Sequence, residues 1–354
     1  MNVKMVFILL WVCLTVPEVA RAQGFADLGT PARGFAEPQP DYKLQFPADH
    51  GAHPAFRIEW WYLTANLTGS DQIEYGLQWT LFRTALSQTA LSQKANSGWN
   101  NTQLWMGHAA VTTPDAHFVT ERLARGGIGQ AGVQADPFEA WIDDWQLVGP
   151  DFATLTVTAS GPDFAYDMVL NSDGPLVFHG DEGYSVKSAE GQASYYYSQP
   201  FYAIEGTLIL PTGTIEVAGD AWLDREWSSQ PLSDNQTGWD WFSLSLEDGK
   251  LMGFRLRQTD GSYYTSATWI DPNGTTTSYS NGAFEADPVA ISDVGGRDVP
   301  TTWNVRLPDR GVDVEVTAIN PQAWMDTSVP YWEGPIIVLG SHTGRGYLEM
   351  TGYD

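Results

Sequence analysis

The sequence predicts an all-β protein with almost no long helix. The first observation is a period-two alternation, in which Ile73, Tyr75, Leu77, Trp79 and Leu81 share one face of an extended segment, as in a half-buried strand. The second is that Gly, Pro, Asn or Asp bound most segments of this kind. The third is a composition of 35 Gly and 16 Trp among 354 residues, typical of many turns and of large, half-buried rings.

Residues 1–22 carry the pattern of an export signal. Lys4 gives a positive start, residues 6–16 form a short apolar core, and residues 20–22 (Ala-Arg-Ala) supply the small-residue pattern for cleavage after Ala22. The apolar run is too short to anchor the chain in a membrane. Cys13, the only cysteine, lies in this segment, so the mature chain is expected to have no disulfide and no thiolate metal site. We therefore expect a periplasmic or secreted protein with no stable membrane span after cleavage.

Alternating segments fill the chain after a lead-in over residues 23–44. Short strands without intervening helical periodicity favour antiparallel barrels or sandwiches over a parallel α/β sheet. Residues 84–103, rich in Gln, Ser, Asn and Ala, are expected to form a long loop of the lid or rim type. A domain boundary is expected near 226–237, where polar residues and Pro interrupt two aromatic strands. Beyond residues 73–81, the alternating segments are 155–159, 164–170, 206–210, 214–222, 241–246, 252–256, 263–270, 303–307 and 312–318.

The charge balance excludes one class of partner. The chain has 18 Lys plus Arg against 43 Asp plus Glu, a formal net charge of −25. Nucleic-acid binding needs a basic stripe that this balance cannot supply, so we expect no nucleic-acid partner and no attraction to anionic membrane surfaces. The acidity itself mainly favours solubility.

Familiar catalytic motifs are missing from the sequence. It has no nucleophile elbow, no zincin helix and no Walker loop. Residues 127–132 match the dinucleotide fingerprint formally, but no strand precedes them and no apolar helix follows. Residues 179–182 are a His-Gly-Asp-Glu run that indicates a turn more than a metal site, because no second ligand group stands at a readable spacing. No metal and no cofactor are therefore expected.

Clusters of aromatic and charged residues carry the strongest signal, at 59–62, 222–227 and 239–242. In the last cluster Asp240 shares a face with apolar residues, and a lone buried carboxylate is costly. In the middle cluster Arg225 points to one face, with Trp222, Asp224 and Glu226 on the other. We predict that Arg225 and Asp240 form a buried ion pair, with a structural role favoured over a catalytic one.

Asp224 and Glu226 are candidates for acid chemistry. When two carboxyl groups share one face beside Trp222, the pKa of one of them can be raised, and that group can then serve as a general acid. Alternatively, both can be solvated residues at the rim. The aromatic residues at 60–62 fit barrel packing or a ligand-stacking surface. His108 and His179 each adjoin a glycine, which allows a backbone or a ligand to come close, although a structural histidine remains the simpler reading.

These clusters resemble the bacterial family that contains the attachment-virulence protein AttH and the carotenoid 1,2-hydratases. The resemblance implies two lipocalin-like antiparallel β-barrel domains packed together with little helix, over residues 45–228 and 229–354. The sequence looks closer to the AttH-like branch, because Tyr195 and Tyr197 stand where the hydratases have a His-x-Trp, and Trp222 stands where they have a Tyr. The matching segments are 59–62, 107–109, 178–180, 195–198, 222–229, 238–242 and 346–353.

The resemblance implies a cavity for an apolar molecule. The first hypothesis is an exported protein that binds a lipid, isoprenoid or polyene and presents it to an envelope transport system. The alternative is a hydro-lyase without metal or nucleotide, in which Asp224 protonates an isolated alkene while Glu226 or Tyr197 positions water. The residues expected to line the cavity are Trp60, Tyr62, Gln78, His108, His179, Tyr195, Trp222, Trp239 and Trp241.

Overall fold

The computed structural model describes residues 34–87, 101–230 and 232–353. The expected export signal, Cys13, and most of the loop expected at 84–103 lie outside these ranges. Within them, the structure contains no helix with the length and apolarity needed to cross a membrane.

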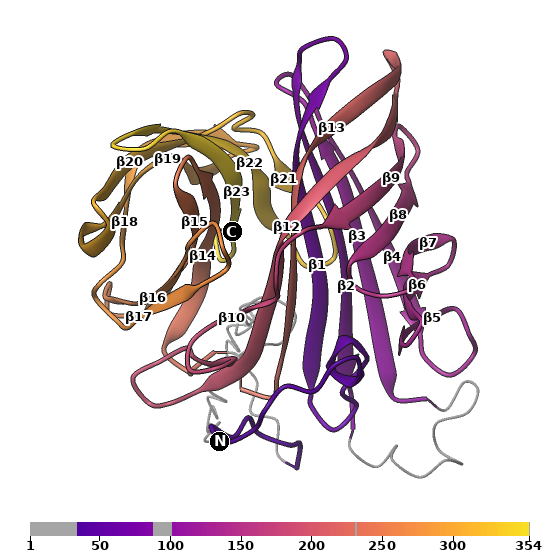
Figure 1. Ribbon diagram of the computed structural model, residues 1–354, viewed down its shortest axis with the longest axis horizontal. Helices are drawn as coiled ribbons and strands as arrows, with labels where there is room; N and C mark the ends of the chain where they lie inside the picture. The colour runs from indigo at the N-terminus through magenta and orange to yellow at the C-terminus, as the bar shows by residue number, and fades with distance from the viewer. Residues whose placement is uncertain (1–33, 88–100, 231, 354) are drawn as a thin grey trace, which may run out of the picture.

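The first half of the described chain forms a 13-stranded antiparallel sheet that curls into a nearly closed barrel (Figure 1). Its main path runs in the order β4-β3-β2-β1-β13-β12-β9-β8-β7-β6-β5, and β10 and β11 both pair with β12. The strands are β1 (Ile58–Gly69), β2 (Glu74–Ala85), β3 (Gln103–Thr112), β4 (His117–Arg125), β5 (Ala131–Ala135), β6 (Phe138–Ile142), β7 (Trp145–Gly149), β8 (Thr154–Ser160), β9 (Ala165–Ser172), β10 (Val177–Phe178), β11 (Tyr184–Val186), β12 (Ala193–Leu210) and β13 (Gly213–Ser228).

The second half forms a 10-stranded antiparallel sheet curled into a half-barrel. Its order is β17-β16-β15-β14-β23-β22-β20-β19-β18, with β21 paired to β22. Short 3₁₀ turns stand at Ala48–His50 and Pro308–Arg310, and the described residues contain no α-helix. The strands are β14 (Gln236–Leu246), β15 (Gly249–Gln258), β16 (Tyr263–Ile270), β17 (Thr276–Tyr279), β18 (Glu285–Val294), β19 (Arg297–Leu307), β20 (Val312–Ala318), β21 (Trp324–Met325), β22 (Tyr331–Gly340) and β23 (Gly344–Met350). The predicted all-β fold with two lipocalin-like barrels is confirmed.

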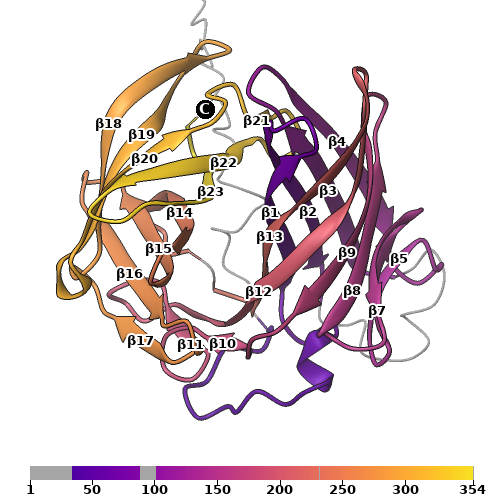
Figure 2. The same cartoon turned by 45° about the horizontal axis from the view of Figure 1, so that its top comes forward.

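Period two explains how each sheet buries both faces. On β1, Trp61, Leu63 and Ala65 point into the first barrel and are fully buried, whereas Trp60 and Tyr62 point towards the second sheet. The second barrel has its own core, which includes Phe242 and Leu244. Figure 2 shows the two sheets meeting along β1 and β13 on one side and β14 and β23 on the other.

The two sheets approach closely where a side chain is missing. Gly76 on β2 lies against Pro335 on β22, and a Cβ at Gly76 would stand only 2.5 Å from Pro335 Cδ. Glycine is therefore required for this close approach of the two sheets. Between the sheets a third buried cluster forms around Tyr62, Tyr196 and Trp241.

Candidate functional site

A cavity of about 80 Å³ lies between the two sheets. Most of the side chains that line it are aromatic or aliphatic, and three carboxyl groups and one amine also line it. The lining residues are Trp60, Tyr62, Phe82, Lys187, Tyr196, Asp224, Glu226, Leu232, Trp239, Trp241, Phe254, Leu256 and Glu349.

Strand register builds the wall that the first barrel contributes. Tyr62 on β1 is the direct partner of Asp224 on β13, and Ser198 on β12 is the partner of Asp224 on its other side. One step along, Trp60 faces Glu226 across the same strand pair. Since directly paired residues project to the same face of a sheet, these side chains form two adjacent rows.

The second sheet supplies the opposite wall by the same rule. Trp241 on β14 is paired with Phe254 on β15 and with Glu349 on β23. Glu349 is in turn paired with Glu333 on β22. A row of two aromatic and two acidic side chains therefore faces the rows of the first barrel.

Asp224 is a buried carboxyl without a cationic partner among the residues that the structure describes. Its Oδ1 accepts hydrogen bonds from Trp222 Nε1 at 2.7 Å and from the Ser198 hydroxyl, and its Oδ2 accepts one from the Tyr196 hydroxyl at 2.9 Å. Burial raises the pKa of Asp224 to about 7, against the lowering effect of these three hydrogen bonds. The negative charge of Glu226 adds to the rise. Near neutral pH, a large fraction of Asp224 is therefore protonated and able to release a proton into an apolar cavity.

Glu226 has the opposite surroundings. Lys187 Nζ lies 2.9 Å from Glu226 Oε1, and the Ser194 hydroxyl donates to the same oxygen. The Lys187 ammonium also lies 4.8 Å from the ring centroid of Tyr196 and 4.3 Å from that of Phe254. Glu226 is thus an ion-paired carboxylate beside the neutral acid.

Glu349 is a further carboxyl of the cavity, contributed by the second barrel. Trp239 Nε1 donates a hydrogen bond of 2.6 Å to Glu349 Oε1. Burial, followed in effect by the negative charges of Asp224 and Glu226, raises the pKa of Glu349 to about 7, although hydrogen bonds lower it in part. Two carboxyl groups on opposite walls therefore titrate in the same range.

The aromatic faces are placed to favour a cation. The ring centroids of Tyr62 and Trp241 are 5.4 Å apart in an edge-to-face arrangement, and Trp241 Nε1 donates to the Tyr196 hydroxyl at 3.0 Å. These contacts fix the rings that face the cavity. Aromatic faces attract positive charge through the ring quadrupole, so a developing cation here would be stabilised in a site of low polarity.

The structure brings six of the predicted site residues to the cavity. Two more, Trp222 and His179, stand directly behind its wall. Trp222 donates a hydrogen bond to Asp224. His179 Nε2 lies 2.6 Å from the Ser198 hydroxyl, and its Nδ1 lies 2.9 Å from the Thr268 hydroxyl. Burial lowers the pKa of His179 well below its usual range, so this ring is neutral. The six residues that line the cavity are Trp60, Tyr62, Asp224, Glu226, Trp239 and Trp241.

The prediction that Tyr197 positions water for Asp224 is wrong. Tyr197 is paired with Arg225, while Asp224 is paired with Ser198, so Tyr197 projects to the opposite face of the sheet. There its hydroxyl lies 2.7 Å from His50 Nδ1 inside the first barrel.

Three expected ligand contacts also lie away from the cavity. Tyr195 points into the first barrel with Tyr197 and bonds to the backbone of Gln39. His108 lies 3.0 Å from the Tyr331 hydroxyl and 3.2 Å from Glu121 Oε1, outside the cavity wall. Gln78 is buried on β2, where its amide donates to the Thr80 hydroxyl.

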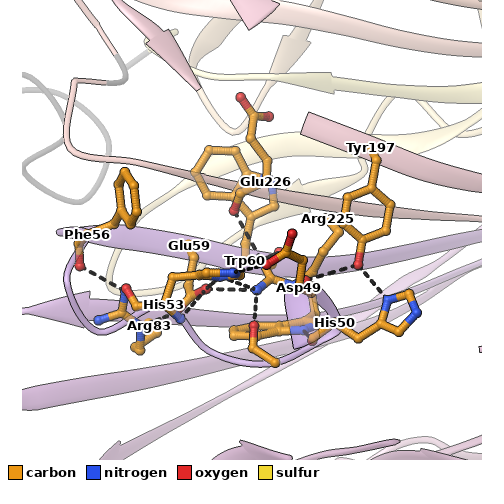
Figure 3. A network of polar contacts seen from close by, with 12 residues as sticks. Asp49, His50, His53, Phe56, Glu59, Trp60, Arg83, Tyr197, Arg225 and Glu226 are labelled. Atoms are coloured by element: carbon orange, nitrogen blue, oxygen red, sulfur yellow. Dashed lines mark hydrogen bonds and ion pairs between the residues drawn. The ribbon is translucent and has the colours of Figure 1, made fainter. Parts of the chain in front are cut away.

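The predicted ion pair between Arg225 and Asp240 is also wrong. Arg225 Nη2 lies 2.8 Å from Glu59 Oε2, and Arg83 binds the other oxygen of Glu59 (Figure 3). Asp240 is instead held by Arg255 Nε at 2.9 Å and by Arg257 within the second barrel.

Each barrel therefore supplies counterions to its own interior. Both charges do point inward, as the strand faces indicate, but they point into different barrels. In Figure 3 the Glu226 carboxylate points away from the network around Arg225, consistent with the alternation along β13.

Several residues that line the cavity were not predicted from the sequence. Glu349 stands in the motif at 346–353, between the core residues Leu348 and Met350. This alternation indicates that Glu349 points to the face of β23 opposite the barrel core. Lys187 lies in a loop segment with no pattern of its own. The others are Phe82, Tyr196, Leu232, Phe254 and Leu256.

The cavity offers oxygen donors and one amine but no compact ligand set. Within residues 34–87, 101–230 and 232–353, no three His, Cys, Asp or Glu side chains gather in a way that could hold a metal ion.

A model of the AttH-like family matches residues 37–353. The chain belongs to the AttH-like family. The resemblance read from the aromatic clusters is thereby confirmed for this family. Comparison with curated proteins gives no significant match.

Solved structures agree with this assignment. An AttH protein from Nitrosomonas europaea has 32% sequence identity and a TM-score of 0.81, and the match covers 90% of this chain and 100% of that one. Kievitone hydratase from Nectria haematococca has 13% identity and a TM-score of 0.63, over 90% and 98% of the two chains. CghA with Sch210972 has 12% identity and a TM-score of 0.53, over 85% and 89%. The last two show a shared fold.

Proposed function

We propose that the chain binds a neutral, apolar molecule in the cavity between its barrels and adds a proton, then water, to an isolated carbon–carbon double bond. The observation that carries this proposal is Asp224, a carboxyl that faces an aromatic cavity. It has no cationic partner in the described part of the chain, and burial raises its pKa to about 7. A carrier cavity can use a polar group to orient its ligand, but it does not need one that holds a proton near neutral pH.

Asp224 would act as the general acid. Its proton forms the new C–H bond, leaving a carboxylate and a carbocation between the barrels. The faces of Trp60, Trp239 and Trp241 stabilise the cation, and the low polarity of the cavity strengthens that attraction. Water then forms the C–O bond and loses a proton. The kinship in fold with kievitone hydratase supports the reaction class.

The competing function is transport or storage of an apolar molecule without chemistry. The aromatic lining favours it, and lipocalin-like barrels bind such molecules through buried area. Under this function Asp224 would serve only to orient the ligand or to hold Ser198 and Trp222 in place.

Mass spectrometry separates the two functions. The mature protein and its Asp224→Asn variant are incubated with an apolar extract of the producing cells, in ordinary and in heavy-oxygen water. A species that gains one water, with its oxygen from the solvent, in the wild type alone supports the enzyme. Capture of one unchanged species by both proteins contradicts it and establishes a carrier.

The place of action is part of the same proposal. The signal pattern of residues 1–22 supports export, after which the mature chain would meet apolar molecules in the periplasm or outside the cell. Fractionation and sequencing of the mature N-terminus test this, with cleavage after Ala22 as the expected result. A protein that keeps Met1 in the cytoplasm contradicts it.

A further inference from the structure

We infer that Glu349 is a second acid–base residue of the cavity, which takes the proton released when water adds, with Tyr62 and Glu333 as positioning residues behind it. The inference rests on the proposed function and assigns the step that the first acid, Asp224, leaves open.

The geometry places Glu349 opposite Asp224. The two residues line the same cavity from different barrels, and Glu349 is held by the indole N–H of Trp239 at 2.6 Å. Glu349 is partly exposed, while Asp224 is only 2% exposed. A reacting molecule between the sheets would therefore meet one carboxyl on each side.

A second buried carboxyl stands directly beside Glu349. Glu333 is its partner across β22 and β23, and directly paired residues of antiparallel strands have Cβ atoms about 5 Å apart. Glu333 is 1% exposed, and neither of its carboxyl oxygens has a hydrogen-bond partner of normal geometry among the described residues. Burial raises its pKa well above the usual range, and the charge of Glu349 adds to this rise.

Tyr62 links these two carboxyls to Asp224. On β1 it is paired with Asp224, and its buried hydroxyl lies close enough to Glu333 and Glu349 to lower the pKa of each. In the described part of the chain this hydroxyl has no hydrogen-bond partner of normal geometry, so it is available to either carboxyl. Glu333 is uncharged, and the Tyr62 hydroxyl can turn towards either Glu333 or Glu349. Together they can keep Glu349 in position whether Glu349 is protonated or ionised.

The protons balance over one turnover. At the start Asp224 is protonated and Glu349 is ionised, so the pair carries one proton. Asp224 gives that proton to carbon, the O–H bond breaks and the C–H bond forms. Water attacks the carbocation, and the oxonium proton passes to Glu349. The pair again carries one proton, on the other member, and its transfer back to Asp224 restores the starting state.

Glu226 is the less suitable base. Lys187 pairs with it at 2.9 Å and the Ser194 hydroxyl occupies the same oxygen, so its charge is already compensated. Glu349 has no cationic partner within the described residues, and the charge of Asp224 is among the causes that raise its pKa. The affinity of Glu349 for a proton therefore increases when Asp224 loses one.

The first test uses the ligand-free mature chain. Glutamate and aspartate carboxyl carbons are labelled with carbon-13 and followed by NMR against pH in the wild type, Glu349→Gln and Asp224→Asn. One glutamate signal is expected to titrate near pH 7, to be missing in Glu349→Gln, and to shift to lower pH in Asp224→Asn. Titration of Glu349 near the ordinary value of about 4.3, or a midpoint unmoved by Asp224→Asn, overturns the inference.

The second test uses the apolar extract in deuterium oxide. Glu349→Gln is expected to lose hydration but to retain deuterium exchange into the recovered alkene, because Asp224 still protonates carbon reversibly. Asp224→Asn is expected to lose both. Hydration by Glu349→Gln at the wild-type rate overturns the inference and leaves the proposed function standing, whereas no hydration by the wild type removes both.

Matched variants guard against loss of folding. Glu285→Gln, an exposed carboxylate paired with Arg306 on the second barrel, is expected to match the wild type in both tests. Where Glu349→Gln does not fold, Glu349→Asp keeps the charge with a shorter reach, and reduced hydration is expected. Tyr62→Phe is expected to shift the Glu349 midpoint upward, since the hydroxyl lowers it; an unmoved midpoint removes the positioning role of Tyr62.

Discussion

Asp224 and Arg225 are neighbours on β13, yet their side chains have opposite surroundings. Arg225 points into the first barrel, where Glu59 and Arg83 complete a buried array of three charges. Asp224 points between the barrels, where it has hydrogen bonds but no counterion within residues 34–87, 101–230 and 232–353. The burial is similar on both faces, so the difference in charge pairing alone separates a structural network from a reactive acid.

Glu59 shows the effect of pairing on a carboxyl. Burial by itself would raise the pKa of Glu59, but the guanidinium groups of Arg83 and Arg225 hold it well below its ordinary value. The carboxylate therefore stays charged and cannot give up a proton at neutral pH. Asp224, at nearly the same depth, keeps its proton up to about pH 7 because its partners are hydroxyls and an indole.

The largest expected effect is on stability, from Glu59→Gln. This change leaves two buried arginines without their anion and should lower the free energy of unfolding by about 3–5 kcal/mol, measured by denaturant titration at pH 7. Asp224→Asn, an equally buried change on the other face, should cost much less. Equal losses for the two variants would contradict the comparison.

The next effect is a pH dependence of opposite sign on the two faces. Since the folded pKa of Asp224 is raised, its contribution to stability relative to Asp224→Asn is complete below about pH 4 and is lost as pH rises to about 7. The expected loss is up to about 4 kcal/mol, at about 1.4 kcal/mol per pKa unit. Since the folded pKa of Glu59 is lowered, the wild type gains over Glu59→Gln above about pH 4 and loses that advantage as pH falls.

Unfolding free energies of the three proteins between about pH 2 and pH 8 measure both differences, because the contribution of Glu59 is lost only below about pH 4. Subtracting each variant from the wild type removes the contribution of the buried histidines, which is common to all three. Two curves of the same sign would show that Asp224 is an ordinary ionised carboxylate.

The smallest expected effect is from Trp241→Phe. The change keeps an aromatic face but removes the N–H that donates to the Tyr196 hydroxyl, so a loss of about 1–2 kcal/mol in stability is expected. Affinity for a neutral solvatochromic dye should fall with it, because Trp241 lines the cavity. Trp303→Phe, a change in the core of the second barrel, should leave dye binding unaffected.

Much of the fold follows from local pattern. Alternation predicted residues 263–270 and 312–318, and these are the bounds of β16 and β20. Strands such as β3 and β22, which are buried on both faces, have no clear alternation and were not predicted. Alternation also separates Arg225 from Asp224 and Glu226, because the face to which a side chain points depends only on its position along one strand.

Pairing between distant segments did not follow from the sequence. Arg225 is 166 residues from Glu59, and nothing in the local pattern distinguishes Glu59 from Asp240 as its partner. Tyr197 was one candidate for positioning water, and only the register of β12 against β13 shows that it projects to the face opposite Asp224. Glu349 reaches the cavity through the packing of two barrels, which period two does not describe.

The most direct test of the central claim is the infrared carbonyl band of protonated carboxylic acids in the ligand-free protein, titrated from pH 4 to pH 9. We predict a band that persists at pH 6, decreases with a midpoint of about 7, and loses one component in Asp224→Asn while remaining whole in Glu59→Gln. Complete ionisation of every carboxyl by pH 5 would contradict it, because the cavity would then hold no acid.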